Sequence, residues 1–108
     1  MGTRTTPQAA ATSTARAPIG RTDEALAELG KAVGHPVRAA IVRLLAAQES
    51  CQYGDLSDRL PLAKSTVSQH LKILREAGLV RVETDGQRVC YCIDQLGLSR
   101  LKALVAEL

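Results

Sequence analysis

The stretch that decides the fold is residues 63–80, with the sequence AKSTVSQHLKILREAGLV. Val67, Leu71 and Leu74 recur at the i, i+4 and i+7 positions, which is the spacing of one buried stripe along a helix. Short polar side chains fill the positions between them, so the opposite face of this helix can donate and accept hydrogen bonds at close range. Gly78 then stops the helix as a left-handed C′ residue would, and a β-rich run follows. This order is typical of a DNA recognition helix followed by a β-hairpin wing.

The rest of the pattern predicts a mainly α domain with a small β-hairpin wing. Asp85-Gly86 is a strong hairpin signal between two strands, and Pro61 marks a short turn before the recognition helix. Together these features predict a winged helix-turn-helix fold, with Thr22 expected to cap its first helix. The expected elements are helices at about 23–33, 36–47, 54–60, 63–77 and 95–108, an edge strand at 50–53, and strands at 79–83 and 88–93.

The first and last helices carry more apolar positions than one small core needs. The first offers Leu26, Leu29 and Val33, and the last offers a longer stripe of leucine and valine. This surplus predicts a homodimer that forms through the terminal helices. The alternative is that these helices only close the monomer.

Length and composition limit the chain to one domain. An N-terminal tail, residues 1–21, is expected to be disordered because it lacks periodicity and large apolar groups. Residues 22–108 form the expected DNA-binding and dimerisation domain. No apolar run reaches the length of about 18 residues that a membrane span needs, and the tail lacks the apolar region of a secretory signal. Three cysteines without an export signal favour a cytoplasmic protein with free thiols.

Charge placement favours DNA as a partner more than net charge does. Three arginines in the tail account for the formal net charge of +3, so residues 22–108 are formally neutral. Between Arg59 and Arg81, however, five basic residues stand against one acid, Glu76. Such a strip can neutralise DNA phosphates, although a solvated helix face has the same pattern.

Three segments resemble the ArsR/SmtB family of bacterial metalloregulators: HPVR at 35–38, LAKSTVSQHL at 62–71 and LREAGLV at 74–80. The resemblance extends over about residues 23–108. It implies a homodimeric repressor that binds an inverted-repeat operator in double-stranded DNA and is released when a metal or metalloid ion binds.

The resemblance also assigns DNA contacts to the exposed N-terminal half of the recognition helix. Gln69 can bond adenine through a donor and an acceptor together, and serines can bond either a base or a phosphate. Thr66 either caps the helix or contacts a phosphate, and His70 either contacts DNA or packs at the domain surface. The candidate base and adjacent phosphate contacts are Ser65, Ser68, Gln69 and His70, and the candidate phosphate contacts that position the duplex are Lys64, Lys72 and Arg88.

The three cysteines form the second candidate site. Cys90 and Cys92 are two residues apart on an expected strand, so their side chains share one face, and Cys51 lies in the strand expected to pair with it. The three thiols are therefore expected to converge. Three thiolates without a fourth ligand suit a pyramidal thiophilic ion such as As(III) or Sb(III), whereas zinc normally takes four ligands. The resemblance makes As(III) the leading inducer.

One departure from the family pattern bears on this site. Many arsenic regulators of the family carry a Cys-x-Cys-Asp-Leu string, and here Gln52 and Gly54 stand at its cysteine positions. Any arsenic site in this chain is therefore built differently. Two alternatives stay open: buried structural cysteines, and a redox or persulfide switch in which Cys51 bonds Cys90 or Cys92.

An enzyme is not expected. Neither His35 nor His70 has the neighbouring acid and oxyanion arrangement that thiol catalysis needs. The sequence has no phosphate-binding or dinucleotide-binding glycine pattern either, and no organic cofactor is expected.

Overall fold

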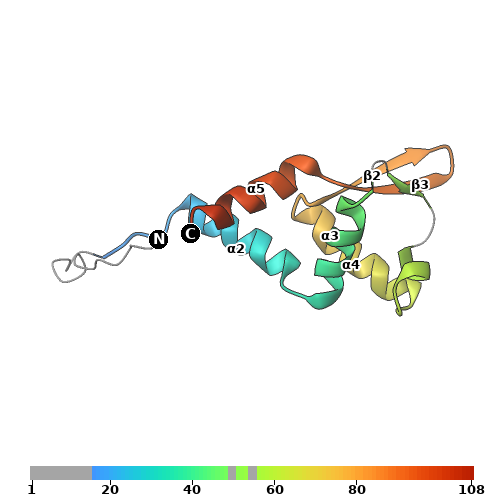
Figure 1. The fold of residues 1–108 in the computed structure, drawn as a ribbon, viewed down its shortest axis with the longest axis horizontal. Coiled ribbons are helices and arrows are strands. Elements are labelled where there is room, and N and C mark those ends of the chain that lie inside the picture. The colour runs from blue at the N-terminus through green and yellow to red at the C-terminus, as the bar shows by residue number, and fades with distance from the viewer. Residues whose placement is uncertain (1–15, 49–50, 54–55) are drawn as a thin grey trace.

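The computed structural model describes residues 16–48, 51–53 and 56–108. The disorder expected for the tail falls mainly outside the described residues, as does the start of the helix expected at 54–60. The described elements, shown in Figure 1, are α2 (Arg21–Val33), α3 (Pro36–Ala46), β1 (Gln52–Tyr53), the 3₁₀ helix η1 (Leu56–Arg59), α4 (Lys64–Glu76), β2 (Val80–Asp85), β3 (Arg88–Ile93) and α5 (Gln95–Ala106).

This order of elements confirms the winged helix-turn-helix prediction. The ends of the four α-helices lie within two residues of the expected positions. The prediction for residues 54–60 is wrong in kind, because the described part forms the short 3₁₀ helix η1. Pro61 has no backbone N–H and disfavours the helical conformation in the residue before it, so the segment ends before a regular α-helix can form.

The start of α2 also differs from the prediction. The N-cap residue is Gly20 rather than Thr22, and the Gly20 N–H donates to Asp23 Oδ2 at 2.9 Å. The first turn of α2 therefore includes Thr22, and the acidic side chains of Asp23 and Glu24 lie where the helix dipole favours negative charge.

The three strands form one antiparallel sheet in the order β1-β3-β2. Val82 lies opposite Tyr91, and this pair lines a cavity together with residues of α4, so one face of the hairpin is turned to the recognition helix. Side chains alternate between the two faces of a strand, so Cys90 and Cys92 lie on the other face. The wing thus has a face toward α4 and a separate cysteine face.

The core is aliphatic, as the near absence of aromatic residues requires. Its largest fully buried side chains are Ile41, Leu45, Leu56, Leu74 and Leu79. They join α3, η1, α4 and the start of the hairpin, and burying each one contributes about 1.5–3 kcal/mol. Cys90 and Cys92 are buried too but are not members of this cluster.

The start of α5 packs tightly against the turn that ends α4. Gly78 in this turn has a φ of 83°, the left-handed conformation of a helix stop. The Asp94 N–H donates to the Leu79 carbonyl oxygen at 2.8 Å. Gly97 lies so close to the turn that a Cβ atom there would meet the Gly78 carbonyl oxygen at 1.9 Å. We call this contact the α4–α5 joint.

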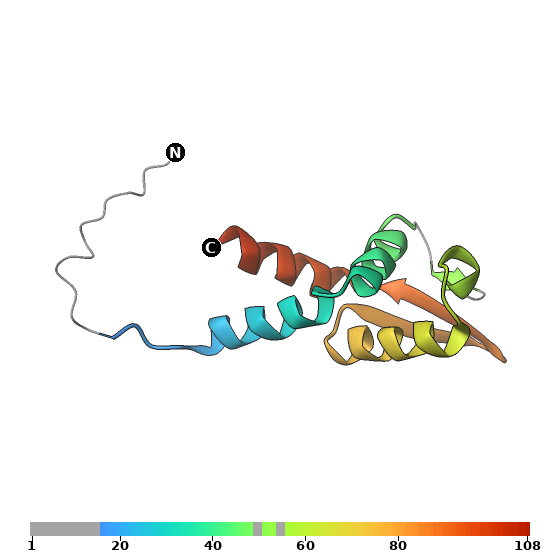
Figure 2. The same ribbon diagram turned by 90° about the horizontal axis from the view of Figure 1, so that it is seen from below.

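Helices α2 and α5 lie side by side and extend away from the rest of the domain (Figures 1 and 2). Every residue of α5 is described, and none is buried in the single chain. Leu96 and Leu108 are each 84% exposed and Val105 is 50% exposed. These helices leave apolar surface uncovered. Within the described ranges, no helix is both long and apolar enough to cross a membrane.

Candidate functional site

The exposed side of α4 carries most of the residues predicted to contact DNA. Val67, Leu71 and Leu74 are buried, whereas Ser65, Ser68, Gln69, Lys64 and Lys72 are exposed. The N-cap residue Ala63 has no polar side chain to bond the first backbone N–H groups of the helix. Free N–H groups at a helix N-terminus attract phosphate oxygens. Thr66, which was expected to cap or to contact a phosphate, is half-buried in this first turn.

The predicted phosphate contacts are accessible. Lys72 pairs with Glu76 at 3.9 Å, with side chains 69% and 63% exposed. An exposed pair of this kind is worth at most about 1 kcal/mol, so Lys72 can exchange its partner for a phosphate at little cost. Arg88 is exposed at the start of β3, at the tip of the wing.

His70 is turned toward the domain rather than along the exposed side of α4. Its ring centroid lies 4.6 Å from that of His35, and its Nδ1 is buried without a hydrogen-bond partner. Burial, followed by the nearby His35 and Arg38, lowers the pKa of His70 from its ordinary value of 6.5. His35 itself caps α3, with Nδ1 accepting the Val37 N–H at 3.1 Å. The geometry favours the packing interpretation of His70.

The structure brings the three cysteines together. Their sulfur atoms all lie within 4.8 Å of one another. In the register of β1 on β3, Gln52 lies opposite Tyr91 and Tyr53 opposite Cys90, which brings Cys51 level with Cys92. Cys51 and Cys92 form a disulfide, with a Cα–Cα distance of 4.5 Å. Cys90 is fully buried beside them and is not part of that bond.

An ion pair on β2 borders this cluster. Arg81 lies opposite Cys92 and Glu83 lies opposite Cys90 in the register of the hairpin. The Arg81 guanidinium donates to the Glu83 carboxylate, whose Oε1 is 3.3 Å from Cys51 Sγ. The cysteine cluster therefore contacts both strands of the wing.

The donor set fits a three-coordinate thiophilic ion once the disulfide is reduced. With bonds of about 2.3 Å, the length of a zinc–sulfur bond, three sulfurs around one ion lie at most about 4 Å apart. The observed spread of 4.8 Å needs closure by about 1 Å to reach that limit. Within the described residues, this group consists of three cysteines that could hold a metal or metalloid ion, and the Glu83 carboxylate beside Cys51 is paired with Arg81 and is not a member of the group.

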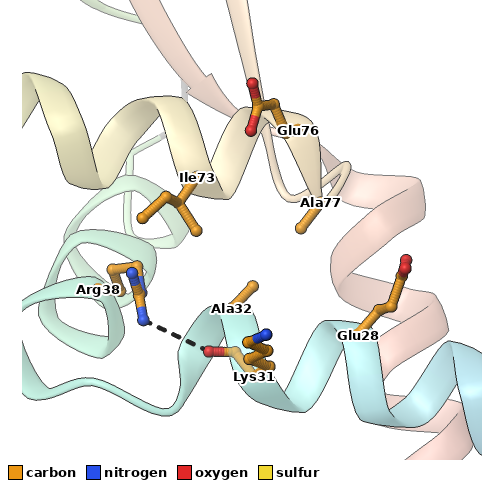
Figure 3. A pocket seen from close by; sticks show the side chains of 7 residues that line it. All are labelled: Glu28, Lys31, Ala32, Arg38, Ile73, Glu76 and Ala77. Atoms are coloured by element: carbon orange, nitrogen blue, oxygen red, sulfur yellow. Dashed lines mark hydrogen bonds between the residues drawn. The ribbon is translucent and has the colours of Figure 1, made fainter.

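One cavity lies beside the cysteines, and a larger one lies beside α4. The smaller, of about 150 Å³, is lined by Leu45, Gln48, Cys51, Arg81, Cys92, Ile93 and Gln95. The larger, of about 400 Å³, lies between α2, α3 and α4, and Figure 3 shows its lining residues Glu28, Lys31, Ala32, Arg38, Ile73, Glu76 and Ala77. In it an Arg38 Nη atom donates to the Lys31 carbonyl oxygen at 3.5 Å.

Three parts of these sites were not foreseen from the sequence: the larger cavity, the His35–His70 contact and the Arg81–Glu83 pair. Of these three features, only the Arg81–Glu83 pair could have been inferred from the sequence pattern. Arg81 and Glu83 alternate with Val80 and Val82, so period-two alternation places both charged residues on the cysteine face. The other two depend on how separate helices pack.

Comparison with known proteins identifies similar regulators. A family of helix-turn-helix domains matches residues 33–83. The HTH-type transcriptional repressor SmtB of Mycobacterium tuberculosis is 44% identical over 68 residues, which cover 63% of this chain and 50% of the repressor. The chain thus matches half the length of that relative.

Two further matches cover more of the similar protein. The HTH-type transcriptional regulator YgaV of Escherichia coli is 34% identical over 85 residues, covering 79% of this chain and 83% of YgaV. A solved structure of a possible transcriptional regulator for arsenical resistance has a TM-score of 0.66 and 34% identity, covering 74% of this chain and 82% of that one. All three are described as transcriptional regulators, which agrees with the prediction that the chain is not an enzyme.

Proposed function

The chain belongs to the ArsR/SmtB family of winged-helix transcriptional regulators, and we propose that it is a cytoplasmic repressor that binds operator DNA as a homodimer. The inducer in this proposal is As(III), with Sb(III) as its close chemical relative. It binds the thiolates of Cys51, Cys90 and Cys92 and releases the operator. The observation that carries the proposal is the convergence of three sulfurs within 4.8 Å. Three thiolates suit a pyramidal ion such as As(III), and the nearest carboxylate, that of Glu83, is paired with Arg81.

The uncovered apolar surface of α5 supports the dimer. Leu96 and Val105 of α5 are exposed in the single chain, as is Leu108 after the helix, and a second copy packing on α2 and α5 would cover such surface. A two-fold dimer presents its two α4 helices to successive major grooves, about one helical turn of DNA apart. Ser65, Ser68 and Gln69 then reach base edges.

Phosphate contacts complete the proposed DNA interface. Lys64, Lys72 and Arg88 position the duplex, and Thr66 lies near the same backbone. His70 has the smaller part in this interface, because it packs on His35.

The position of the cysteine cluster supports a coupling to DNA affinity. Cys51 follows α3, whereas Cys90 and Cys92 lie on β3, which leads directly into α5. Tying Cys51 to β3 therefore acts on the strand that connects the wing to the proposed dimer helix. A coupling of about 1–3 kcal/mol between inducer and operator changes operator affinity roughly 5- to 150-fold.

The test is operator binding by the reduced protein, followed by fluorescence anisotropy during an arsenite titration. The operator duplex is first selected from a random pool by the protein itself. We expect arsenite to release the wild type and to leave the Cys51/Cys90/Cys92→Ser triple variant bound. Release of both proteins, or of neither, contradicts the proposal.

A dithiol–disulfide switch is the second candidate, and the Cys51–Cys92 disulfide is the observation that favours it. Two thiols lose two electrons and two protons to a peroxide or persulfide oxidant, and a dithiol reductant reverses the step. Cys90→Ser separates the two candidates. It removes one of three ligands for As(III) but keeps both members of the disulfide, so it abolishes an arsenite response and preserves an oxidant response.

A further inference from the structure

The cavity of about 150 Å³ beside the Cys51–Cys92 pair is the feature that the proposed function leaves unused. Cys92 is only 6% exposed, and it lines this cavity, whereas Cys90 is fully buried and does not. A reagent that approaches Cys92 from this side must first occupy the cavity.

The size of the cavity limits what it can hold. Pockets for drug-sized molecules have volumes of about 300–1,000 Å³, so this cavity is at most half as large. Leu45 and Ile93 are buried members of the aliphatic core and form one side of the cavity. Because the core is close-packed, these side chains cannot move outward to enlarge the cavity without disrupting the core. Gln48 and Gln95 lie on the more open part of the lining.

The charge of the cavity limits its contents further. Among the described residues that line the cavity, Arg81 is the one ionic side chain, and its charge is matched by the carboxylate of Glu83. The amide groups of Gln48 and Gln95 offer donors and acceptors suited to hydroxyl groups. Arsenite at neutral pH is the uncharged trihydroxide As(OH)₃, which matches a small, polar and electrically neutral lining.

We propose that this cavity is the vestibule through which the inducer reaches the cysteines, and that Gln48 and Gln95 restrict it to small neutral hydroxides. Aryl arsenicals and glutathione conjugates are too large to enter. The inference rests on the proposed function. In each exchange an As–O bond is replaced by an As–S bond, and the thiol proton leaves with the displaced hydroxide as water, without electron transfer.

The test uses the reduced 108-residue chain and stopped-flow absorbance of arsenic–thiolate bonds. The probes are arsenite and phenylarsenous acid, each normalised to its rate with free dithiothreitol. We expect arsenite to associate with the wild type at least tenfold faster than the phenyl compound. Gln48→Trp, which fills the vestibule, should slow arsenite at least tenfold, and Gln48→Ala should accelerate the phenyl compound. The matched control is Gln87→Trp, at the hairpin turn far along the wing.

A readout without arsenic separates this inference from the proposed function. Alkylation of Cys92, followed by mass spectrometry, should be fast with iodoacetamide and slow with a fluorescein-sized maleimide, and Gln48→Ala should reduce that difference. Size selection in alkylation without any arsenite binding overturns the proposed inducer and leaves the vestibule supported as an access route. Arsenite binding with equal rates for both probes, unchanged by either Gln48 variant, overturns the vestibule.

Discussion

Replacement of Gly97 by alanine tests the α4–α5 joint. A Cβ atom at this position would lie 1.9 Å from the Gly78 carbonyl oxygen and 2.9 Å from the Gly78 carbonyl carbon. Real Cβ atoms stay at least 3.0 Å from such atoms, so the start of α5 must move by about 1.1 Å or the turn after α4 must yield. Both neighbours are backbone atoms in a packed region, and overpacking of this kind costs about 1–3 kcal/mol.

The helix propensity of alanine opposes this cost. Alanine is favoured over glycine inside a helix by about 1 kcal/mol. Gly30→Ala, in the middle of α2, supplies the matched control because a Cβ atom there meets nothing within 4 Å. A difference of about 1–3 kcal/mol between the two variants corresponds to a melting temperature lower by roughly 4–24 °C for Gly97→Ala, at about 4–8 °C per kcal/mol.

The assay is thermal unfolding by circular dichroism at one protein concentration, together with operator anisotropy. We expect Gly30→Ala to melt at or above the wild type and Gly97→Ala to melt below both. If Gly97→Ala melts as high as Gly30→Ala, the close approach of α5 to the Gly78 turn does not constrain the fold and the argument is refuted.

Three further predictions concern other parts of the molecule. Because the folded chain lowers the pKa of His70 below 6.5, the unfolded chain binds more protons as the pH falls through 6.5. The free energy of unfolding in urea should therefore be highest above pH 6.5 and decline below it, and His70→Gln should remove part of this decline. If the variant shows the same pH dependence as the wild type, the packing of His70 on His35 is contradicted. Val105→Lys, on the exposed stripe of α5, should shift sedimentation toward monomer, whereas Ser99→Lys on the same helix should not; equal effects argue against a dimer through α5. Lys72→Ala should reduce operator affinity and should lower the slope of log affinity against log salt concentration by about one, whereas Lys102→Ala should change neither quantity. If the two variants behave alike, Lys72 does not contact a phosphate in the DNA interface.

The fold could be predicted because its strongest local signals agree with the tertiary structure. The helical period of Val67, Leu71 and Leu74 coincides with the buried side of α4, and the glycine stop at Gly78 has the expected positive φ. The segment at 54–60 could not be assigned correctly from its leucines alone. It is too short to form an α-helix before Pro61, and short apolar segments do not distinguish an α turn from a 3₁₀ turn.

The cysteine site was predictable to a similar degree. Period-two alternation placed Cys90 and Cys92 on one face, but the choice of Cys92 as the partner of Cys51 depends on the register of β1, which is only two residues long. A shift by one residue turns every side chain of a strand to the other face, and no local pattern fixes so short a strand. His35 and His70 meet only because α3 and α4 pack together, which the spacing of either helix does not show.

The Cys51–Cys92 bond encloses a covalent ring of the chain, with a sequence separation of 41 residues. The ring contains η1, α4 and β2, so almost the whole DNA-reading unit lies inside it. Closing a loop of this length removes conformational entropy from the unfolded chain worth about 4 kcal/mol in the loop-closure model. Opening the ring therefore makes the reading unit easier to unfold and to degrade. We therefore expect the reduced chain to be degraded faster than the disulfide-bonded chain, so that the redox state of these two cysteines would affect the lifetime of the protein.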